Sequence, residues 1–259
     1  MIDALYIGAT GMQAQQLNVD SIANNLANIN TSGYKRSRVS FDDLLYRDVA
    51  RTAATAQSSD ASGRAGVGVS LANISKIFTQ GDLKKTDVPL DVAIQGQGFF
   101  EITLPDGSLA YTRSGHFQIN RDGYLVTADG HPLKDQIQVP NDAREIVIQA
   151  TGAVLANLPD EKDLVEIGQI ELTNFVNPSG LSPQGSNLYV STELSGESIN
   201  GKPGESGFGT LAQGSLESSN VKLIEETLGL IVAQRAYEVN AKVIQAADEM
   251  LGMSNNLRR

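Results

Sequence analysis

The sequence contains no cysteine and only two histidines, and basic residues are outnumbered by acidic ones. Without cysteine the chain can form neither disulfides nor thiolate metal sites, and its cysteine content does not indicate a redox compartment. Lys and Arg number 20 against 30 Asp and Glu, which gives a net charge of −10. Nucleic acid requires a phosphate-neutralising surface, and the only basic run here is the short one at Lys35, Arg36 and Arg38. We therefore expect no nucleic-acid partner.

Long apolar runs are also missing. The first residues have neither the basic nor the continuously apolar segment of a cleavable signal peptide, and no stretch reaches the length of a membrane-spanning helix. We therefore expect no direct membrane insertion, and export would need another route. Hydrophobic residues make up 41% and aromatic residues 5% of the 259 positions, which is enough for one β-rich domain of modest core with helical ends.

No constellation of catalytic, cofactor-binding or metal-binding residues stands out. His116 and His131 have no further ligand at short spacing. Residues 196–202 match the phosphate-loop pattern, but Pro203 follows where a Ser or Thr would bind Mg²⁺. Oxygen-bearing residues within 118–129 have calcium-loop spacing, which a hairpin turn explains better. The sequence thus predicts no catalytic centre, no cofactor and no metal site.

Both ends of the chain are predicted as long helices with apolar faces. Near the start, two interleaved sets recur every seven residues: Leu5, Met12, Val19 and Leu26, and Gly8, Gln15, Ile22 and Ile29. The glycine and the glutamine would leave gaps against a single partner helix. Near the other end, a similar repeat is widened by further apolar residues: Leu223, Leu230, Tyr237, Ile244 and Leu251, with Leu228, Val232, Val239, Val243 and Met250.

The apolar face of the C-terminal helix is too broad for a solvated surface helix. Two such helices paired alone could not cover it. Packing of both helices onto the chain's own globular domain is one way to cover the stripes. Packing against further copies of the chain is the other, and periodicity alone leaves both open.

The middle of the chain is typical of an antiparallel β domain. The β-type segments are 88–94, 99–104, 116–120, 145–149 and 164–175. Asp-Gly pairs at 106–107, 122–123 and 129–130 predict hairpins with type I′ turns, which require positive φ at both central residues. The predicted fold class is α+β: N- and C-terminal helices paired in a coiled-coil-like domain, an extended or β connecting region, and a central antiparallel β domain.

The boundaries follow from these patterns. The first helix is predicted to end in an Asn-rich stretch with Gly33 as its left-handed stop. Residues 191–219, rich in Gly, Ser and Glu, are interpreted as a linker returning to the last helix. We expect a terminal helical assembly domain at 1–30 and 220–259, a connecting region at 31–74 and 206–219, and a central β-rich domain at 75–205.

Two terminal motifs resemble the signatures of the flagellar axial proteins, the family of rod, hook and hook-associated subunits. SIANNLANINTSGYKR (21–36) is similar to the N-terminal signature, and LGLIVAQRAYEVNAKVIQAADEML (228–251) resembles the matching C-terminal helix. Between them, VPLDVAIQGQGFFEI (88–102) is similar to the start of the middle domain of the larger rod and hook members. The resemblance covers nearly the whole chain, with the motifs in the correct order.

The resemblance implies a structural subunit, not an enzyme, whose terminal helices pack into the inner layer of a rigid hollow shaft that transmits torque from motor to hook. The implied assembly residues at the N-terminal end are Leu5, Met12, Val19, Ile22, Asn24, Asn25, Leu26, Asn28, Thr31, Gly33 and Tyr34. Those at the C-terminal end are Leu223, Leu228, Leu230, Tyr237, Val239, Ile244 and Leu251. Segment 46–69, rich in small residues, is expected to lie extended between adjacent subunits and to stiffen the shaft.

Chain length and this small-residue segment favour a member from the distal part of the rod. A proximal rod paralogue of similar length, a hook-type subunit, a secreted glycan-acting enzyme and a secreted adhesin or effector stay open as alternatives. The resemblance further implies export by the flagellar type III apparatus without a cleavable signal, and a location in the basal body across the periplasm. Implied partners are further copies of the chain, proximal rod subunits, hook protein, the surrounding P and L ring proteins and the export apparatus.

Overall fold

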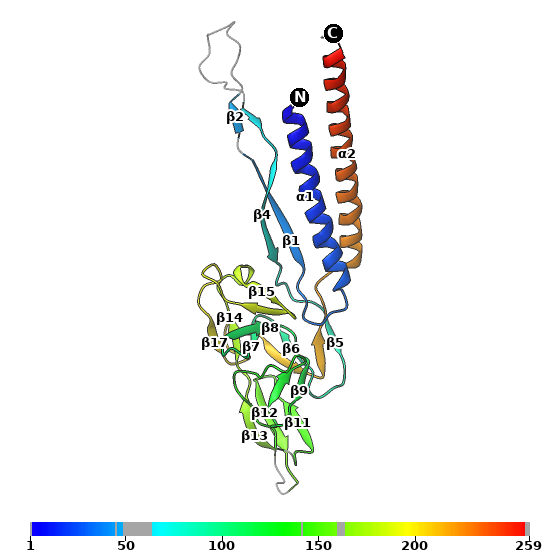
Figure 1. Cartoon of the computed structure of the whole chain (residues 1–259). Coiled ribbons are helices and arrows are strands. Elements are labelled where there is room, and N and C mark those ends of the chain that lie inside the picture. The colour runs from blue at the N-terminus through cyan, green and yellow to red at the C-terminus, as the bar shows by residue number, and fades with distance from the viewer. Residues whose placement is uncertain (1, 45, 49–63, 141, 160–163, 257–259) are drawn as a thin grey trace. The chain divides into compact units, whose positions relative to one another are not determined.

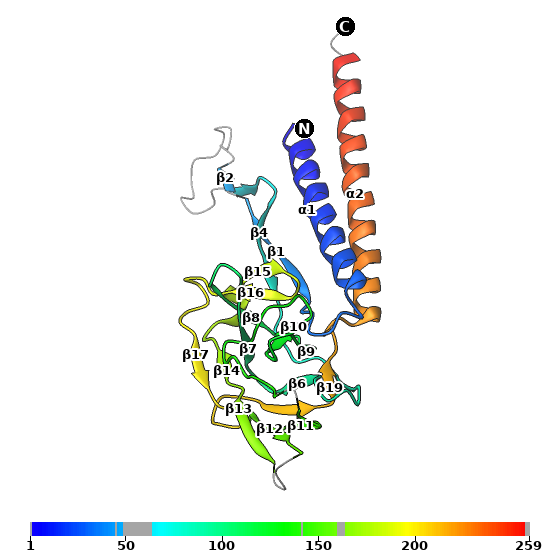
Figure 2. The same cartoon turned by 60° about the horizontal axis from the view of Figure 1, so that its bottom comes forward.

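The computed structural model describes residues 2–44, 46–48, 64–140, 142–159 and 164–256. Backbone contacts divide the chain into two compact units (Figures 1 and 2). The helical unit comprises Met1–Leu26, Ser37–Ser75 and Lys222–Arg259, and the β unit comprises Ala27–Arg36 and Lys76–Val221. The predicted α+β class is confirmed. Most of the predicted stiffening segment, residues 49–63, lies outside the described residues.

The helical unit is built from two antiparallel helices and a long β ribbon. Helices α1 (Ile2–Ala27) and α2 (Leu223–Asn256) lie side by side in both views. The ribbon consists of β1 (Ser37–Asp43) paired with β4 (Val69–Lys76), and β2 (Tyr46–Asp48) paired with β3 (Arg64–Gly66). Its β1 end joins α1 through Asn25, whose side-chain amide donates to Ser37 O and whose Oδ1 accepts from Ser37 N, at 2.9 and 2.8 Å.

Local chemistry favours the start of each helix. Acidic residues lie in the first turn of each helix, where they oppose the positive end of the helix dipole: Asp3 in α1, and Glu225 and Glu226 in α2. Helix α1 ends at Ala27, inside the Asn-rich stretch. The prediction that Gly33 stops this helix is wrong, because Gly33 lies six residues further on, in the β unit.

Gly33 is required there for a different reason. It adopts φ +71° and donates its N–H to Glu217 O at 2.8 Å. A Cβ at this position would lie 2.7 Å from Ser114 N, which is closer than real Cβ contacts come. The glycine therefore lets two backbone segments of the β unit touch.

We predict that Gly33→Ala destabilises the β unit by about 2–3 kcal/mol, because it adds a steric clash to the strain of positive φ. Gly107→Ala is the matched control, since Gly107 has φ +82° and open space around its Cβ position. Chemical denaturation of both variants separates the two contributions. Equal losses in the two variants would mean that the close approach at Gly33 contributes nothing.

The described residues of the β unit form two larger antiparallel sheets and three strand pairs. Its strands are β5 (Leu83–Lys85), β6 (Val92–Gln95), β7 (Phe99–Thr103), β8 (Leu109–Thr112), β9 (Phe117–Ile119), β10 (Leu125–Thr127), β11 (Glu145–Ile148), β12 (Ala153–Asn157), β13 (Val165–Gln169), β14 (Leu172–Asn174), β15 (Ser182–Gly185), β16 (Leu188–Val190), β17 (Ile199–Gly201), β18 (Thr210–Gln213) and β19 (Ser215–Glu217). A 3₁₀ helix, η1 (Pro178–Gly180), precedes β15. The six-stranded sheet has the order β15-β16-β8-β7-β14-β17, and the three-stranded sheet β11-β12-β13. The pairs are β18-β6, β19-β5 and β10-β9.

Both faces of the six-stranded sheet are buried. Along β7, Phe100 and Ile102 belong to the main core cluster, while Phe99 belongs to a second cluster with Tyr111 and Tyr189. Alternate residues of a strand point to opposite faces, so this strand contributes to both clusters. That double burial explains why Phe99, Phe100 and Ile102 are all apolar although they lie on both faces of the sheet.

The three predicted hairpins are confirmed, but their predicted turn type is wrong. Among the turn residues only Gly107, Gly123 and Gly130 have positive φ, at 82°, 86° and 86°. Each glycine donates its N–H to the carbonyl three residues earlier, at 2.9 to 3.1 Å. This is the pattern of a type I turn followed by a left-handed glycine, in which Asp keeps an ordinary conformation. In the second hairpin, Oδ1 of Asn120 accepts from Asp122 N and Tyr124 N, so a turn accounts for the calcium-like spacing.

The interpretation of residues 191–219 as a linker is also wrong. Strands β17, β18 and β19 lie in this range and pair with β14, β6 and β5. Residues 199–201 of the phosphate-loop-like motif form β17 rather than a loop that leads into a helix. The partner strands are distant in sequence, so local composition gave no sign of this pairing.

A buried ion cluster joins the two ends of the β unit. Glu217 Oε1 lies 2.6 Å from Lys35 Nζ, and Oε2 lies 3.1 Å from Arg113 Nε, with all three side chains at most 3% exposed. Lys35 also donates to Thr79 O at 2.9 Å, and Gly81 N donates to Glu217 Oε1 at 2.8 Å. Burial lowers the pKa of Lys35, and the neighbouring Glu217 carboxylate opposes that shift.

Candidate assembly surfaces

Helices α1 and α2 meet along a seam of small and polar residues. Gly8 lies against Ile244 and Gly11 against Asn240, so close that a Cβ on either glycine would lie within 2.8 Å of the opposing side chain. At the other end of the seam, the Asn25 amide donates to Glu226 Oε2 at 3.2 Å. The expectation that Gly8 leaves a gap against a single partner helix is therefore wrong, because Ile244 fills it.

The residues of the seam on α2 recur every seven positions and differ from the predicted apolar repeat. Its members are Glu226, Ala233, Asn240 and Ala247. Glu226, Ala233 and Ala247 are buried, and each is 1% exposed. The prediction favoured large apolar residues, whereas the helices approach closely where side chains are small. The recurrence of Glu226, Ala233 and Ala247 at multiples of seven residues was the pattern in the sequence that could have indicated the seam.

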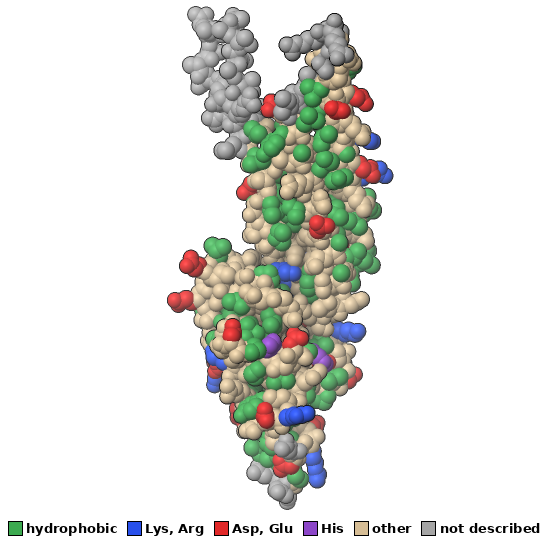
Figure 3. All heavy atoms as spheres, viewed as in Figure 1, with side chains coloured by type: hydrophobic (Ala, Val, Ile, Leu, Met, Phe, Trp, Pro, Cys, Tyr) green, Lys and Arg blue, Asp and Glu red, His purple; other side chains and the backbone are tan. Residues whose placement is uncertain are grey.

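An apolar face of α2 outside this seam is exposed within the helical unit. It consists of Val232, Val239, Val243, Met250 and Met253, which we name the α2 stripe. Spacings of seven, four, seven and three residues place these side chains on one side of the helix. Their exposed fractions run from 43% to 67%. In Figure 3, apolar side chains gather along the two helices.

The predicted assembly residues fall into three groups. Ile22 and Asn25 are buried in the helical unit, where Ile22 contacts Gly229 of α2. The half-buried group is Leu5, Met12, Val19, Leu26, Leu230, Ile244 and Leu251. The exposed group is Asn24, Leu223, Leu228, Tyr237 and Val239.

The rest of the predicted N-terminal signature belongs to the β unit. Gly33 and Tyr34 are buried there, and Asn28 and Thr31 are half-buried, with Thr31 Oγ1 donating to Asn28 Oδ1 at 3.2 Å. The structure therefore separates the signature into a helical part and a β-unit part. Only the first part contributes to the pairing of α1 with α2.

Asp135 and Glu101 are shielded carboxylates, and both make structural contacts. Burial raises the pKa of Asp135, whose Oδ2 accepts from Glu171 N at 3.0 Å. Glu101 pairs with Lys134 at 2.7 Å, and the Glu101 carboxylate raises the pKa of Lys134. Within the described residues, no group of three or more His, Asp or Glu side chains could hold a metal ion. None of the helices in that part of the chain is long and apolar enough to cross a membrane.

Comparison with known proteins identifies the family. The model of the flagella basal body rod protein matches residues 5–35, and that of the flagellar basal body rod FlgEFG protein C-terminal region matches 212–257. Between them, the flagellar hook protein FlgE/F/G D1 domain matches residues 93–156. The flagellar basal-body rod protein FlgG of Borreliella burgdorferi is 47% identical over 100% of both chains. The chain belongs to the flagellar basal-body rod protein family.

Other members of the rod protein family match over the same length. FlgG of Agrobacterium fabrum is 46% identical over 98% of this chain and 99% of its own. For Bacillus subtilis, FlgG is 39% identical over 100% of both chains, and the hook-basal body complex protein FlhP is 28% identical over 100% of both. The chain therefore resembles the rod proteins named FlgG more than it resembles FlhP. The family is one of structural proteins rather than enzymes.

Proposed function

We propose that this chain is a structural subunit of the distal rod of the bacterial flagellar basal body. Copies polymerise through the terminal helices into a rigid hollow helical shaft that transmits torque from the motor to the hook. The observation that carries the proposal is the α2 stripe, because five large apolar side chains stay exposed after α1 and α2 have paired. A head-to-tail contact that does not close on itself generates a helical filament, and such a contact would bury the stripe.

The energetics favour assembly. Burying one large apolar side chain contributes about 1.5 to 3 kcal/mol, so partial burial of five of them outweighs the side-chain ordering that each contact requires. Full-length similarity to proteins named FlgG supports the distal position over the proximal paralogue. Catalysis has no part in this function.

Membership of the rod protein family supports a setting in the flagellar basal body. The proposed partners are other copies of the chain, proximal rod subunits, hook protein, and the P and L ring proteins that surround the rod. The subunit passes through the flagellar export apparatus without a cleaved signal and is located in the basal body, across the periplasm. Stiffening of the shaft by segment 46–69 stays a prediction.

Electron microscopy of the concentrated protein tests the proposal. We expect shafts from the full chain and none after removal of residues 1–30, because α2 then loses its seam partner. Circular dichroism of the truncated chain shows whether the β unit is still folded. Shafts that persist without residues 1–30 would contradict assembly through the terminal helices.

A further inference from the structure

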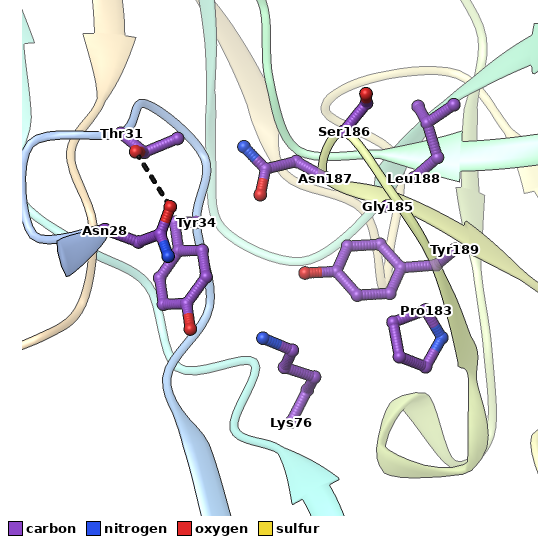
Figure 4. A pocket seen from close by; sticks show the side chains of 10 residues that line it. All are labelled: Asn28, Thr31, Tyr34, Lys76, Pro183, Gly185, Ser186, Asn187, Leu188 and Tyr189. Carbon is purple, nitrogen blue, oxygen red and sulfur yellow. Dashed lines mark hydrogen bonds between the residues drawn. The ribbon is translucent and has the colours of Figure 1, made fainter. Parts of the chain in front are cut away.

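The β unit contains a pocket of about 240 Å³ that the pairing of the terminal helices does not use (Figure 4). Its lining includes three residues of the N-terminal signature, Asn28, Thr31 and Tyr34. Lys76 and the β15–β16 hairpin with Asn187 and Tyr189 complete the wall. This volume is below the roughly 300 Å³ at which pockets for drug-sized ligands begin. It therefore fits the tip of a side chain better than a cofactor.

Lys76 places an unpaired positive charge in this pocket. Its ammonium donates to Lys35 O at 3.1 Å and lies 4.3 Å from the centre of the Tyr34 ring. Burial lowers its pKa. Among the described lysines that are buried or half-buried, Lys35 pairs with Glu217 and Lys134 with Glu101, whereas Lys76 has no carboxylate partner. A partly buried charge without a counter-charge is unfavourable, so the site is suited to receive an anion.

Tyr189 supplies a second unused donor. The residue is 1% exposed, and its hydroxyl points into the pocket in Figure 4. It makes no hydrogen bond with any residue that the structure describes, although its ring packs edge-on against Phe78 and Phe99. Buried hydroxyl groups normally have a partner. This one faces the space beside the Lys76 ammonium.

The wall of the pocket formed by the β15–β16 hairpin is preformed. Ser186 and Asn187 are held at φ 48° and 57°, a conformation that non-glycine residues rarely adopt. The Asn187 amide donates to Ser32 O at 3.2 Å, and Thr112 Oγ1 donates to Asn187 O at 3.0 Å. The first bond connects the β15–β16 hairpin to the N-terminal signature, and the second connects it to β8, so the hairpin wall of the pocket is held in place.

We propose that this pocket binds the carboxylate of an Asp or Glu side chain from a second copy of the chain. The Lys76 ammonium and the Tyr189 hydroxyl are the donors. With 30 acidic against 20 basic residues, each copy offers many carboxylates, while like charge makes most approaches between copies repulsive. The Lys76 ammonium, at one fixed place, therefore favours the one orientation of two copies in which a carboxylate reaches it. The inference rests on the proposed polymer and adds to it a contact made by the β unit.

Assembly of full-length variants tests this contact. Lys76→Met removes the charge, and Tyr189→Phe removes only the hydroxyl and keeps the ring packing. We expect each to raise the critical concentration for polymerisation, measured by sedimentation, about tenfold or more, without lowering the melting temperature. Lys84→Met is the matched control, since Lys84 is exposed and outside the pocket. Added salt screens the repulsion between copies in both proteins but the Lys76–carboxylate attraction only in the wild type, so it should favour assembly of Lys76→Met relative to the wild type.

A second measurement distinguishes a neighbour's side chain from a free carboxylate. Acetate added to dilute monomer is expected to shift the NMR signals of Lys76 and Tyr189, and at higher concentration to inhibit polymerisation. Acetate binding together with unchanged assembly of Lys76→Met would mean that the pocket takes a small carboxylate, and would overturn the proposal. The absence of acetate binding would also overturn it. If the wild type forms no polymer, the proposed function fails, and the acetate measurement on the monomer still tests the pocket.

Discussion

Replacing Val239 with glutamate is expected to abolish shaft formation while leaving the isolated subunit folded. Val239 is in the middle of the α2 stripe and 59% exposed, so a charge there remains hydrated in the monomer. In the polymer the same charge would be buried against apolar side chains without a partner, which costs several kcal/mol. We expect the critical concentration to rise at least about a hundredfold, equivalent to about 2.7 kcal/mol per subunit. Electron microscopy and sedimentation provide the measurement.

Gln245→Glu is the control for this experiment. Gln245 is exposed on the same stretch of α2, and its position in the helical repeat is away from the α2 stripe. The control adds the same charge and should assemble at close to the wild-type concentration. Normal shafts from Val239→Glu would show that the stripe is not buried between subunits. Failure of both variants would indicate a general effect of negative charge on this acidic chain.

Glu217→Gln is expected to destabilise the β unit by about 3–5 kcal/mol. The substitution removes the only carboxylate in contact with both Lys35 and Arg113 among the described residues, and leaves two positive charges buried side by side. Glutamine keeps the size of the side chain, so the loss reports the charge rather than a cavity. Chemical denaturation followed by the near-ultraviolet signal of the buried tyrosines measures it. Glu238→Gln is the control, because its ion pair with Arg235 is exposed and contributes little.

The pH dependence of this variant gives an independent check. Burial already lowers the pKa of Lys35 below 10.5, and loss of Glu217 removes the attraction that opposes the shift. Between the native pKa of Lys35 and 10.5, the unfolded chain binds more protons than the native state, so stability from this group increases as pH rises. Glu217→Gln should therefore recover part of its lost stability in mildly alkaline solution. A loss below about 1 kcal/mol at neutral pH, with no such recovery, would contradict the assigned role of the cluster.

Features of the fold with a local cause could be predicted from the sequence. The helices at both ends follow from apolar spacing, and the three hairpins follow from Asp-Gly pairs. The turn type was missed because an Asp-Gly pair fits both a type I′ turn and a type I turn followed by a left-handed glycine. Only the backbone angles separate the two.

Features that depend on distant segments could not be predicted. Glu217 and Lys35 are 182 positions apart, and nothing in the sequence around Lys35 shows that this basic residue is buried. Strands β18 and β19 are short, and their composition resembles a loop, so their pairing depends on β6 and β5. The broad apolar face of α2 was evident from sequence, but its division into a seam of small residues and an exposed stripe required the partner helix.

The chain enters the β unit at Ala27 and again at Lys76 and leaves it for the last time after Val221. Its first and last parts are tied together, because Gly33 N donates to Glu217 O and Lys35 pairs with the Glu217 carboxylate. An insert whose two ends are tied together in this way can be enlarged, shortened or exchanged without changing the register of the helices that flank it. In longer homologues, the extra residues are thus expected between the positions equivalent to Lys35 and Glu217. The same junction is where a foreign module could be grafted onto the helical hairpin.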